Sequence, residues 1–493
     1  MEKMERLTPL KPLPALIALV IGLTIWFIIP APAGVSPNAW QLLALFVGTI
    51  AAIIGKALPI GAVSVVAIAL VALTGVTNPG KPAAALNDAL SGFSNSLIWL
   101  IGISIMVSQS LNKTGLGERI GYWFIALCGK RTLGIAYGLA LAETSLAPVT
   151  PSNTARGGGI IHPIMRSIAD SFDSHPRPGS TEKIGRYLSL VNYNINPITS
   201  AMFITATAPN PLIVNLIAKG TGHEFELSWG AWALAALLPA LLSLLLMPLV
   251  VYWLYPPQIR HTPDAPGFAR ERLRALGPIS LAEKITLAVF ILLLVLWADI
   301  PAWLLGAGWS VNATTAAFIG LAILLCSGVL SWDDLLKCKG AWDTVVWFAA
   351  LVMMATFLGK LGLIAWLSQS VSLLIDGLGM HWVGAMVLLT LVYVYAHYFF
   401  ASTTAHITAM FAAFFAAGLA LGVPPALFAL VLAFSSSLMM SLTHYATGTA
   451  PIIFGSGYVT LGEWWKTGFI LSVVNLTLWL SVGSLWWHWL GYW

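Results

Sequence analysis

Long apolar runs, separated by short polar loops, follow one another along the 493-residue chain. A helix needs about 20 apolar residues to cross the hydrocarbon core of a bilayer, so the runs predict on the order of ten crossings. Apolar positions are continuous within each run, which favours helices over a barrel. The runs lie near residues 13–30, 40–55, 59–78, 95–112, 187–207, 229–254, 283–300, 312–330, 343–359, 424–447 and 467–489. The sequence therefore predicts an all-α polytopic membrane protein.

Two further apolar stretches, about 132–168 and about 383–422, are interrupted in the middle by polar and small residues. In the first, Pro148, Pro151 and the glycines of "SNTARGGG" prevent one continuous helix. Inside hydrocarbon, irregular backbone is stable only where protein buries it or where it borders a wet cavity. Each stretch therefore predicts a re-entrant hairpin, in which one helix enters, turns and returns to the same side.

The returning helix of each hairpin is expected to begin at a polar triplet. A Ser or Thr N-cap would leave free N–H groups and the positive end of the helix dipole near the bilayer midplane. Such a helix start favours binding of a carboxylate. The two triplets are Ser152, Asn153 and Thr154, and Ser402, Thr403 and Thr404.

Several motifs occur twice, in the same order, along the chain. "PSNTAR" (151–156) returns as "ASTTAH" (401–406), and "TAPN" (207–210) returns as "TAPI" (449–452). Such duplication is typical of transporters that bind their cargo near the bilayer midplane. The predicted organisation is an N-terminal half (1–254), a cytoplasmic linker (255–284) and a C-terminal half (285–493).

Each half also contains a helix interrupted by proline, about 187–218 in the first and about 431–460 in the second. The backbone carbonyls released at such a break can hold a cation or shape an anion site. A simple proline kink explains one such segment equally well, but it explains two at matching positions less well. The candidate residues at these breaks are Thr207, Pro209, Asn210, Thr449 and Pro451.

Composition narrows the class of protein. The chain is 58% hydrophobic and 9% charged, whereas soluble domains carry roughly 25% charged residues. The net charge of +5 comes from loops and not from a basic cluster interleaved with aromatic residues, so no nucleic-acid partner is expected. The three cysteines lack metal or redox spacing, and no catalytic motif is present. We therefore expect neither a metal site, nor a cofactor, nor an enzyme.

Basic residues set the expected orientation in an inner (plasma) membrane. Lys3, Arg6 and Lys11 precede the first apolar run, and further Lys and Arg residues populate 255–284, so both segments are expected in the cytoplasm. The start of the chain looks like a signal peptide, but its apolar run is long enough to span, which favours a retained first helix. The tail "SLWWHWLGYW" has no Lys or Arg and is expected on the periplasmic or extracellular side.

Three ionisable residues near the hairpin triplets are candidate charge partners. Arg156 and His406 each lie two residues after a triplet, where either could supply positive charge to a bound dianion. Glu143 lies in the entering arm of the first hairpin, where it could instead neutralise Arg156 in a structural pair. His406 could equally be a hydrogen-bonded core histidine.

The motifs "LAPVTPSNTARGGGIIHPI", "ATAPN", "HYFFASTTAHITAM" and "THYATGTAPIIFGSGYV" closely resemble the divalent anion:sodium symporter (DASS) family. The nearest likeness is to its exchanger branch, the bacterial citrate/succinate and tartrate/succinate antiporters and the plastid 2-oxoglutarate/malate translocator. The resemblance implies about eleven transmembrane helices and two re-entrant hairpins, in inverted repeats. It also implies a homodimer and an elevator mechanism that exchanges di- or tricarboxylates of the citrate, tartrate, malate, 2-oxoglutarate or succinate class.

In this family the two triplets contact the substrate carboxylates. Thr403 stands where sodium-coupled members have Asn, and its hydroxyl lacks the second donor of an amide. This departure, with Arg156 and His406 as positive charges, favours sodium-independent exchange. Sodium-coupled symport of the same substrates is the alternative, and an anion channel is the alternative from a different class.

Overall fold

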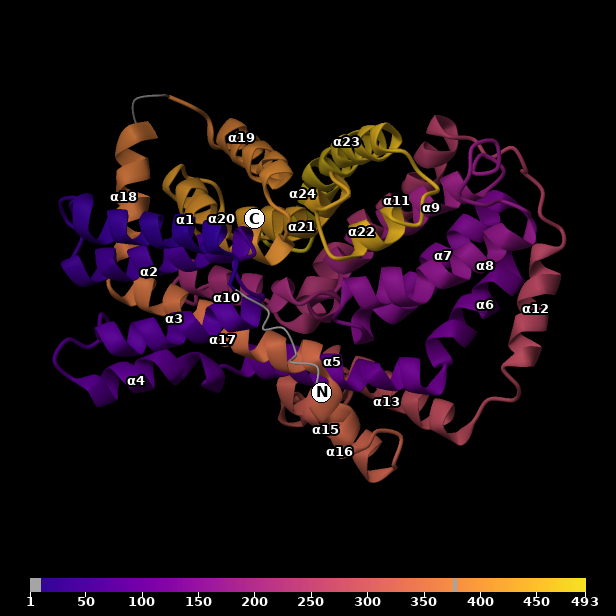
Figure 1. Ribbon diagram of the computed structural model, residues 1–493, viewed down its shortest axis with the longest axis horizontal. Helices are drawn as coiled ribbons and strands as arrows, with labels where there is room; N and C mark the ends of the chain where they lie inside the picture. Colours follow the sequence, from indigo (N-terminus) through magenta and orange to yellow (C-terminus); the bar gives the residue numbers. More distant parts are fainter. Residues whose placement is uncertain (1–9, 376–378) are drawn as a thin grey trace, which may run out of the picture.

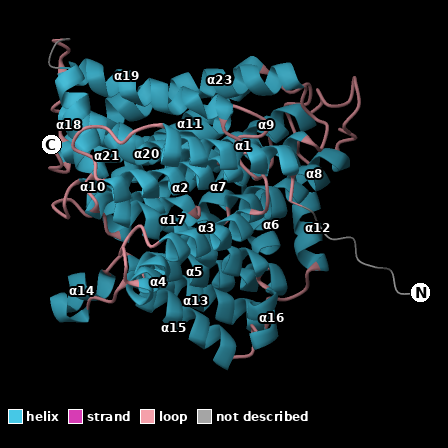
Figure 2. Cartoon of the chain, turned by 60° about the vertical axis from the view of Figure 1, so that its left-hand side comes forward, coloured by secondary structure: helices cyan, strands magenta, loops and turns pink. Residues whose placement is uncertain are grey.

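The computed structural model describes residues 10–375 and 379–493, and these residues form helices and loops (Figure 2). Lys3 and Arg6, which enter the orientation argument, lie outside the described residues. Within the described ranges, seven helices are long and apolar enough to cross a membrane, or eight if the pair α4–α5 with its 48° bend is one span. The protein is therefore an all-helical, multi-span membrane protein. The count of eleven spans stays a prediction.

The long apolar segments pack side by side as a bundle (Figure 1). They are α2 (Pro37–Ile54), α7 with the 3-10 turn η3 (Thr132–Val149), α11 (Trp229–Leu254), α17 (Lys339–Lys360), α19 with η7 (Trp382–Phe399), α20 (Thr403–Ala420) and α23 continuing to α24 (Leu461–Trp489). The bent pair is α4 with η2 (Pro82–Ser94) and α5 (Ser96–Thr114). Shorter apolar segments are α1 with η1 (Pro12–Ile28), α3 (Ile60–Thr74), α15 (Ala313–Cys326) and α21 with η8 (Pro425–Ser441).

The remaining helices connect or complete these segments. They are α6 (Leu116–Cys128), α8 (His162–Ser171), α9 (Gly185–Met202), α10 (Pro209–Gly220), α12 (Ala265–Ala275), α13 (Leu281–Trp297), α14 (Ile300–Leu305), α16 (Trp332–Lys337), α18 (Leu363–Ile375) and α22 (Thr449–Phe454).

Two helical hairpins lie at the two apolar stretches that polar and small residues interrupt. In the first, α7 is followed by η3 (Ala147–Val149), a tip, the π-helix η4 (Thr154–Ile161) and then α8. In the second, α19 and η7 lead to a tip at 400–402, from which α20 returns. Figure 1 shows the first hairpin to the right and the second at the upper left, with α21 and α22 between them. That both hairpins enter the membrane and return stays a prediction.

Two helices are broken in the middle. α9 ends at Met202, and Phe203 after it has an extended backbone. A short 3-10 turn, η5 (Ile204–Ala206), precedes α10, which begins at Pro209. Proline fits this first position of a helix because its missing N–H is not needed there. In the second half, α21 with η8 ends at Ser441, and α22 begins only at Thr449. Pro197, by contrast, lies inside α9 without ending it.

The hydrophilic segment 255–284 contains a helix, α12, which the sequence pattern did not indicate. α12 packs against α6, and the rings of Tyr122 and Phe268 are 6.4 Å apart. Just before α12, an isolated antiparallel β-bridge pairs His261 with Arg131. The segment is therefore docked on the bundle.

The molecule has two distinct ends. Figure 2 shows α12 and α16 toward its right-hand side, and α14, α18 and the C-terminus toward its left. At the first end, Arg119 of α6 pairs with Glu283 of α13 at 2.6 Å. At the second, the ring of Trp493 lies 6.1 Å from that of Trp382. We name these the connector end and the tail end.

Candidate functional site

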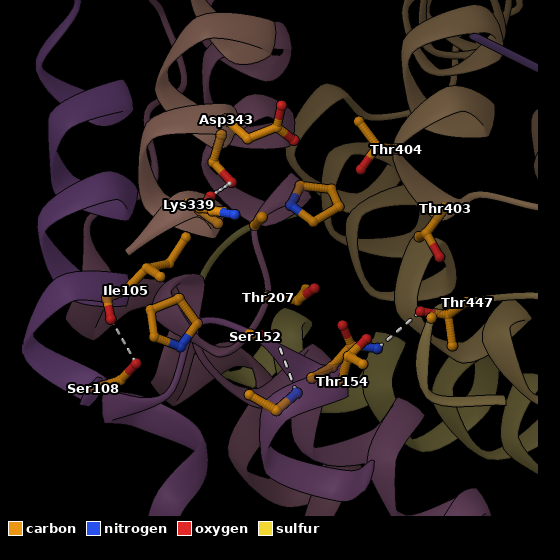
Figure 3. Close-up of a pocket in the computed structure, with 18 of the residues that line it drawn as sticks. Ile105, Ser108, Ser152, Thr154, Thr207, Lys339, Asp343, Thr403, Thr404 and Thr447 are labelled. Atoms are coloured by element: carbon orange, nitrogen blue, oxygen red, sulfur yellow. Dashed lines mark hydrogen bonds between the residues drawn. The ribbon is translucent and has the colours of Figure 1, made fainter. Parts of the chain in front are cut away.

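A cavity of about 550 Å³ lies where the two hairpin tips meet the two helix breaks (Figure 3). From the predicted site it is lined by Ser152, Asn153, Thr154, Ser402, Thr403, Thr404, Thr207 and Pro209. Thr447 and Gly448, at the second break, complete this wall. Residues far apart in the sequence, from both halves, thus share one cavity.

The two tips have the same local geometry. The Ser152 hydroxyl accepts a hydrogen bond from the Ala155 N–H at 3.1 Å, and the Ser402 hydroxyl accepts one from the Ala405 N–H at 3.3 Å. The serine carbonyls accept from Arg156 N–H at 3.0 Å and from His406 N–H at 3.1 Å. Each tip therefore starts a helical segment at the cavity wall, with a capping serine and with positive partial charge at its N-terminus.

Asn153 joins the two halves behind the first tip. Its amide Nδ2 donates to Thr447 Oγ1 at 2.9 Å, and it lies 3.2 Å from both Thr449 Oγ1 and Asn196 Oδ1. Thr449 is fully buried and lies behind the cavity lining. Asn153 therefore holds the tip of the first hairpin against the break of the second half.

The other two residues predicted at the breaks lie outside the lining of this cavity. Asn210 donates from Nδ2 to the carbonyls of Ser200 at 2.8 Å and Phe203 at 2.9 Å, so it satisfies the end of α9 and holds the first break. Pro451 is exposed on α22. Neither side chain therefore lines the cavity.

Arg156 and Glu143 form a fully buried ion pair, with Nε and Oε1 3.4 Å apart. The guanidinium also donates from Nη1 to the carbonyls of Thr150 at 2.7 Å and Ala206 at 2.8 Å. Glu143 Oε1 accepts from Asn196 Nδ2 at 2.6 Å. The pair lies outside the cavity lining, so in this structure Arg156 ties the first tip to the first break.

His406 also lies behind its tip and not in the cavity lining. It is fully buried, its Nδ1 is 2.9 Å from Nδ1 of His397, and its ring lies 4.5 Å from that of Phe400. His397 Nε2 contacts the Ala446 carbonyl at 2.9 Å, at the second break. The histidine pair therefore joins the second hairpin to the second break, much as Arg156 does in the first half.

The glycines after the first triplet allow close packing. A Cβ added to Gly157 would lie 2.7 Å from Asn196 Nδ2 and 3.2 Å from Thr449 Cγ2. One added to Gly158 would lie 3.1 Å from Ile452. At Gly159 nothing lies within 4 Å. The first two glycines thus let the returning arm press against α9 and α22.

The opposite wall comes from α5, the end of α16 and the start of α17, which sequence reasoning did not assign to the site. It includes Ser108 and Gln109 of α5, and the run from Lys337 to Gly340 with Asp343 and Thr344. The only signal for it was the charged sequence "KCKG" directly before an apolar run. The described residues contain no group of three or more His, Cys, Asp or Glu side chains that could hold a metal ion.

Paired hairpins and paired helix breaks around one polar cavity define a membrane transporter. The chain belongs to the DASS family, because residues 11–493 match the model described as "Sodium:sulfate symporter transmembrane region". It is a transporter and not an enzyme.

Relatives match nearly the whole chain. YflS of Bacillus subtilis (strain 168), a proposed malate transporter, is 49% identical over 98% of this chain and 97% of its own. Dicarboxylate transporter 1, chloroplastic, of Spinacia oleracea is 44% identical over 97% of this chain and 82% of its own. The solved structure of the YdaH transporter of Alcanivorax borkumensis shares the fold at 13% identity, with a TM-score of 0.59 over 87% of this chain and 98% of its own.

Proposed function

We propose that this protein exchanges dicarboxylates across the cell inner (plasma) membrane, taking malate, succinate and 2-oxoglutarate as the core of its substrate range. The observation that carries the proposal is the cavity wall built from two serine-capped helix starts. Two such starts, from opposite halves, place two positive N-termini at one wall, where a carboxylate of a small dianion can bind. The names of the malate and chloroplast dicarboxylate relatives support this substrate class.

Sodium-independent exchange is the proposed coupling. Carbonyls at a helix break are the groups that would hold Na⁺ in a transporter of this kind. Here the guanidinium of Arg156 already contacts the carbonyls of Thr150 and Ala206, and His397 contacts that of Ala446. A protein cation or donor thus contacts one backbone carbonyl at each break. Arg156 is neutralised by Glu143, so the charge left in an empty carrier is the partial charge of the two helix starts at the tips. Without an anion these helix starts are uncompensated, which favours obligatory exchange.

The proposed cycle is an elevator within a homodimer, in which the hairpins and broken helices move together against the remaining helices. Arg156, Asn153 and the histidine pair support this division, because each ties a tip to a break. The connector end is proposed to face the cytoplasm and the tail end the periplasm or exterior.

Counterflow in proteoliposomes tests the function. Vesicles preloaded with succinate should take up labelled malate with or without Na⁺, and empty vesicles should not. Uptake that needs Na⁺ and proceeds into empty vesicles would establish symport instead. Steady conductance without internal substrate would establish a channel.

Variants connect the function to the cavity. Ser152→Ala and Ser402→Ala each remove a capping hydroxyl at the wall and should raise the half-saturating malate concentration several-fold. Ser145→Ala is the matched control, since Ser145 is an exposed serine of the same hairpin, bonded at 2.8 Å to its own helix at Leu141. Equal effects of all three variants would contradict a role of the cavity serines in substrate binding.

A further inference from the structure

The charged residues that line the cavity are unevenly distributed. The wall made by the tips and breaks presents hydroxyls, an amide and backbone groups, while the charged lining residues are Lys337, Lys339 and Asp343. All three belong to α16 or α17. Lys339 and Asp343 lie across the cavity from Thr154 and Thr403 (Figure 3). Full charge in the described lining therefore comes from one side only.

Two of these three charges already have partners. Lys337 pairs with Asp333 at 2.5 Å. The Asp343 carboxylate lies against the start of α3, where the Gly61 N–H donates to it. Lys339 is exposed, and in the described part of the chain no carboxylate oxygen lies within 4.0 Å of its amino group. Its charge is thus available to a molecule in the cavity.

The position of Lys339 does not serve its own helix. Lys339 is the first residue of α17, and a cation at a helix N-terminus is opposed by the helix dipole. The helix gains nothing from this charge, whereas an anion beside it would meet both the ammonium group and the positive end of α17.

This wall faces the connector end. A second cavity of about 420 Å³ shares Gln109, Lys337 and Cys338 with the first and extends to Lys113 and Asp334. Those two residues form an ion pair at 2.6 Å between α5 and α16. The second cavity therefore borders the first at Gln109, Lys337 and Cys338, on the side that leads toward the connector end.

We propose that Lys339 is a binding determinant for the second carboxylate of the dianion, acting only while the cavity is open to the connector end. The inference rests on the proposed function and adds a specificity residue to it. A dicarboxylate held at one end by the tips meets Lys339 with its other end, whereas a monocarboxylate has no group to place there. Lys339 thus raises selectivity for dianions on one side of the membrane.

Lys339→Gln tests this in vesicles of defined sidedness. In inside-out membrane vesicles, where the connector end faces the medium, the half-saturating malate concentration should rise about two- to fivefold. In right-side-out vesicles it should stay within error of wild type. Lys339→Arg should restore the wild-type value in both. Lys284→Gln is the control, because it removes one exposed charge at the connector end away from the cavity.

The outcomes separate the two proposals. An unchanged half-saturating concentration in both vesicle types, or an equal rise in both, would overturn the role of Lys339 while leaving dicarboxylate exchange intact. Failure of the wild-type protein to exchange dicarboxylates would overturn the proposed function itself. If Lys339→Gln does not fold, Lys339→Arg and Lys339→Met are compared in the same vesicles. A charge effect raises the half-saturating malate concentration of Lys339→Met and leaves that of Lys339→Arg unchanged.

Discussion

Replacing Glu143 with glutamine should strongly destabilise the protein, because it leaves the Arg156 guanidinium buried without a counter-charge. Both side chains are fully buried. Removing one partner of a buried pair costs about 3–5 kcal/mol. Glutamine retains the shape and one carbonyl acceptor, and the guanidinium retains the carbonyls of Thr150 and Ala206. We therefore expect a loss near the lower end, about 3 kcal/mol.

Thermal unfolding in detergent measures the effect. Glu143→Gln and Arg156→Met should each lower the unfolding temperature markedly. The double variant Glu143→Leu with Arg156→Met should recover much of the loss, because an apolar pair leaves no buried charge behind.

Transport assays on Glu143→Gln or Arg156→Met, whichever can be purified, distinguish a structural role of the ion pair from a role in substrate binding. The fraction that folds should keep a half-saturating malate concentration close to wild type, because neither side chain lines the cavity. A Glu143→Gln protein that unfolds at the wild-type temperature would refute the reasoning. So would a double variant whose loss equals the sum of the two single losses.

Two further predictions concern the packing of the first hairpin and the lining of the cavity. Gly157→Ala should lower the unfolding temperature, because its Cβ would lie 2.7 Å from Asn196 Nδ2. Gly159→Ala should leave it unchanged, since nothing lies within 4 Å of the added Cβ. Equal unfolding temperatures of the two variants would contradict the packing role of Gly157. In a protein with Cys128 and Cys326 replaced by serine, malate should slow maleimide labelling of Cys338, which lines the cavity. Labelling that ignores malate, while transport is intact, would place the substrate elsewhere.

The sequence predicted the helical, multi-span class, whereas the two re-entrant hairpins and the division into two halves stay predictions. These features depend on local chemistry: apolar runs define the helices, and Pro209 together with the polar triplets marks where a helix stops or starts. The repeat of "PSNTAR" as "ASTTAH" also indicated that the two triplets play equivalent parts in the two halves, and both triplets line the cavity.

Other features could not be predicted, because they depend on contacts between distant segments. Lys339 belongs to the cavity only because α17 packs across from the hairpin tips. The burial of His406 against His397 depends on how the second hairpin closes on its break. The helix within 255–284 has too few apolar residues to show a strong pattern, and α6 stabilises it by packing.

The contacts of Asn153 also determine the order in which the protein can be assembled. Its partners Thr447 and Thr449 lie 294 and 296 residues further along the chain. While the ribosome is still making the second half, the first hairpin is already complete but its amide has no threonine to bind. The tie between the first hairpin and the second break can therefore form only after Thr447 and Thr449 have been made.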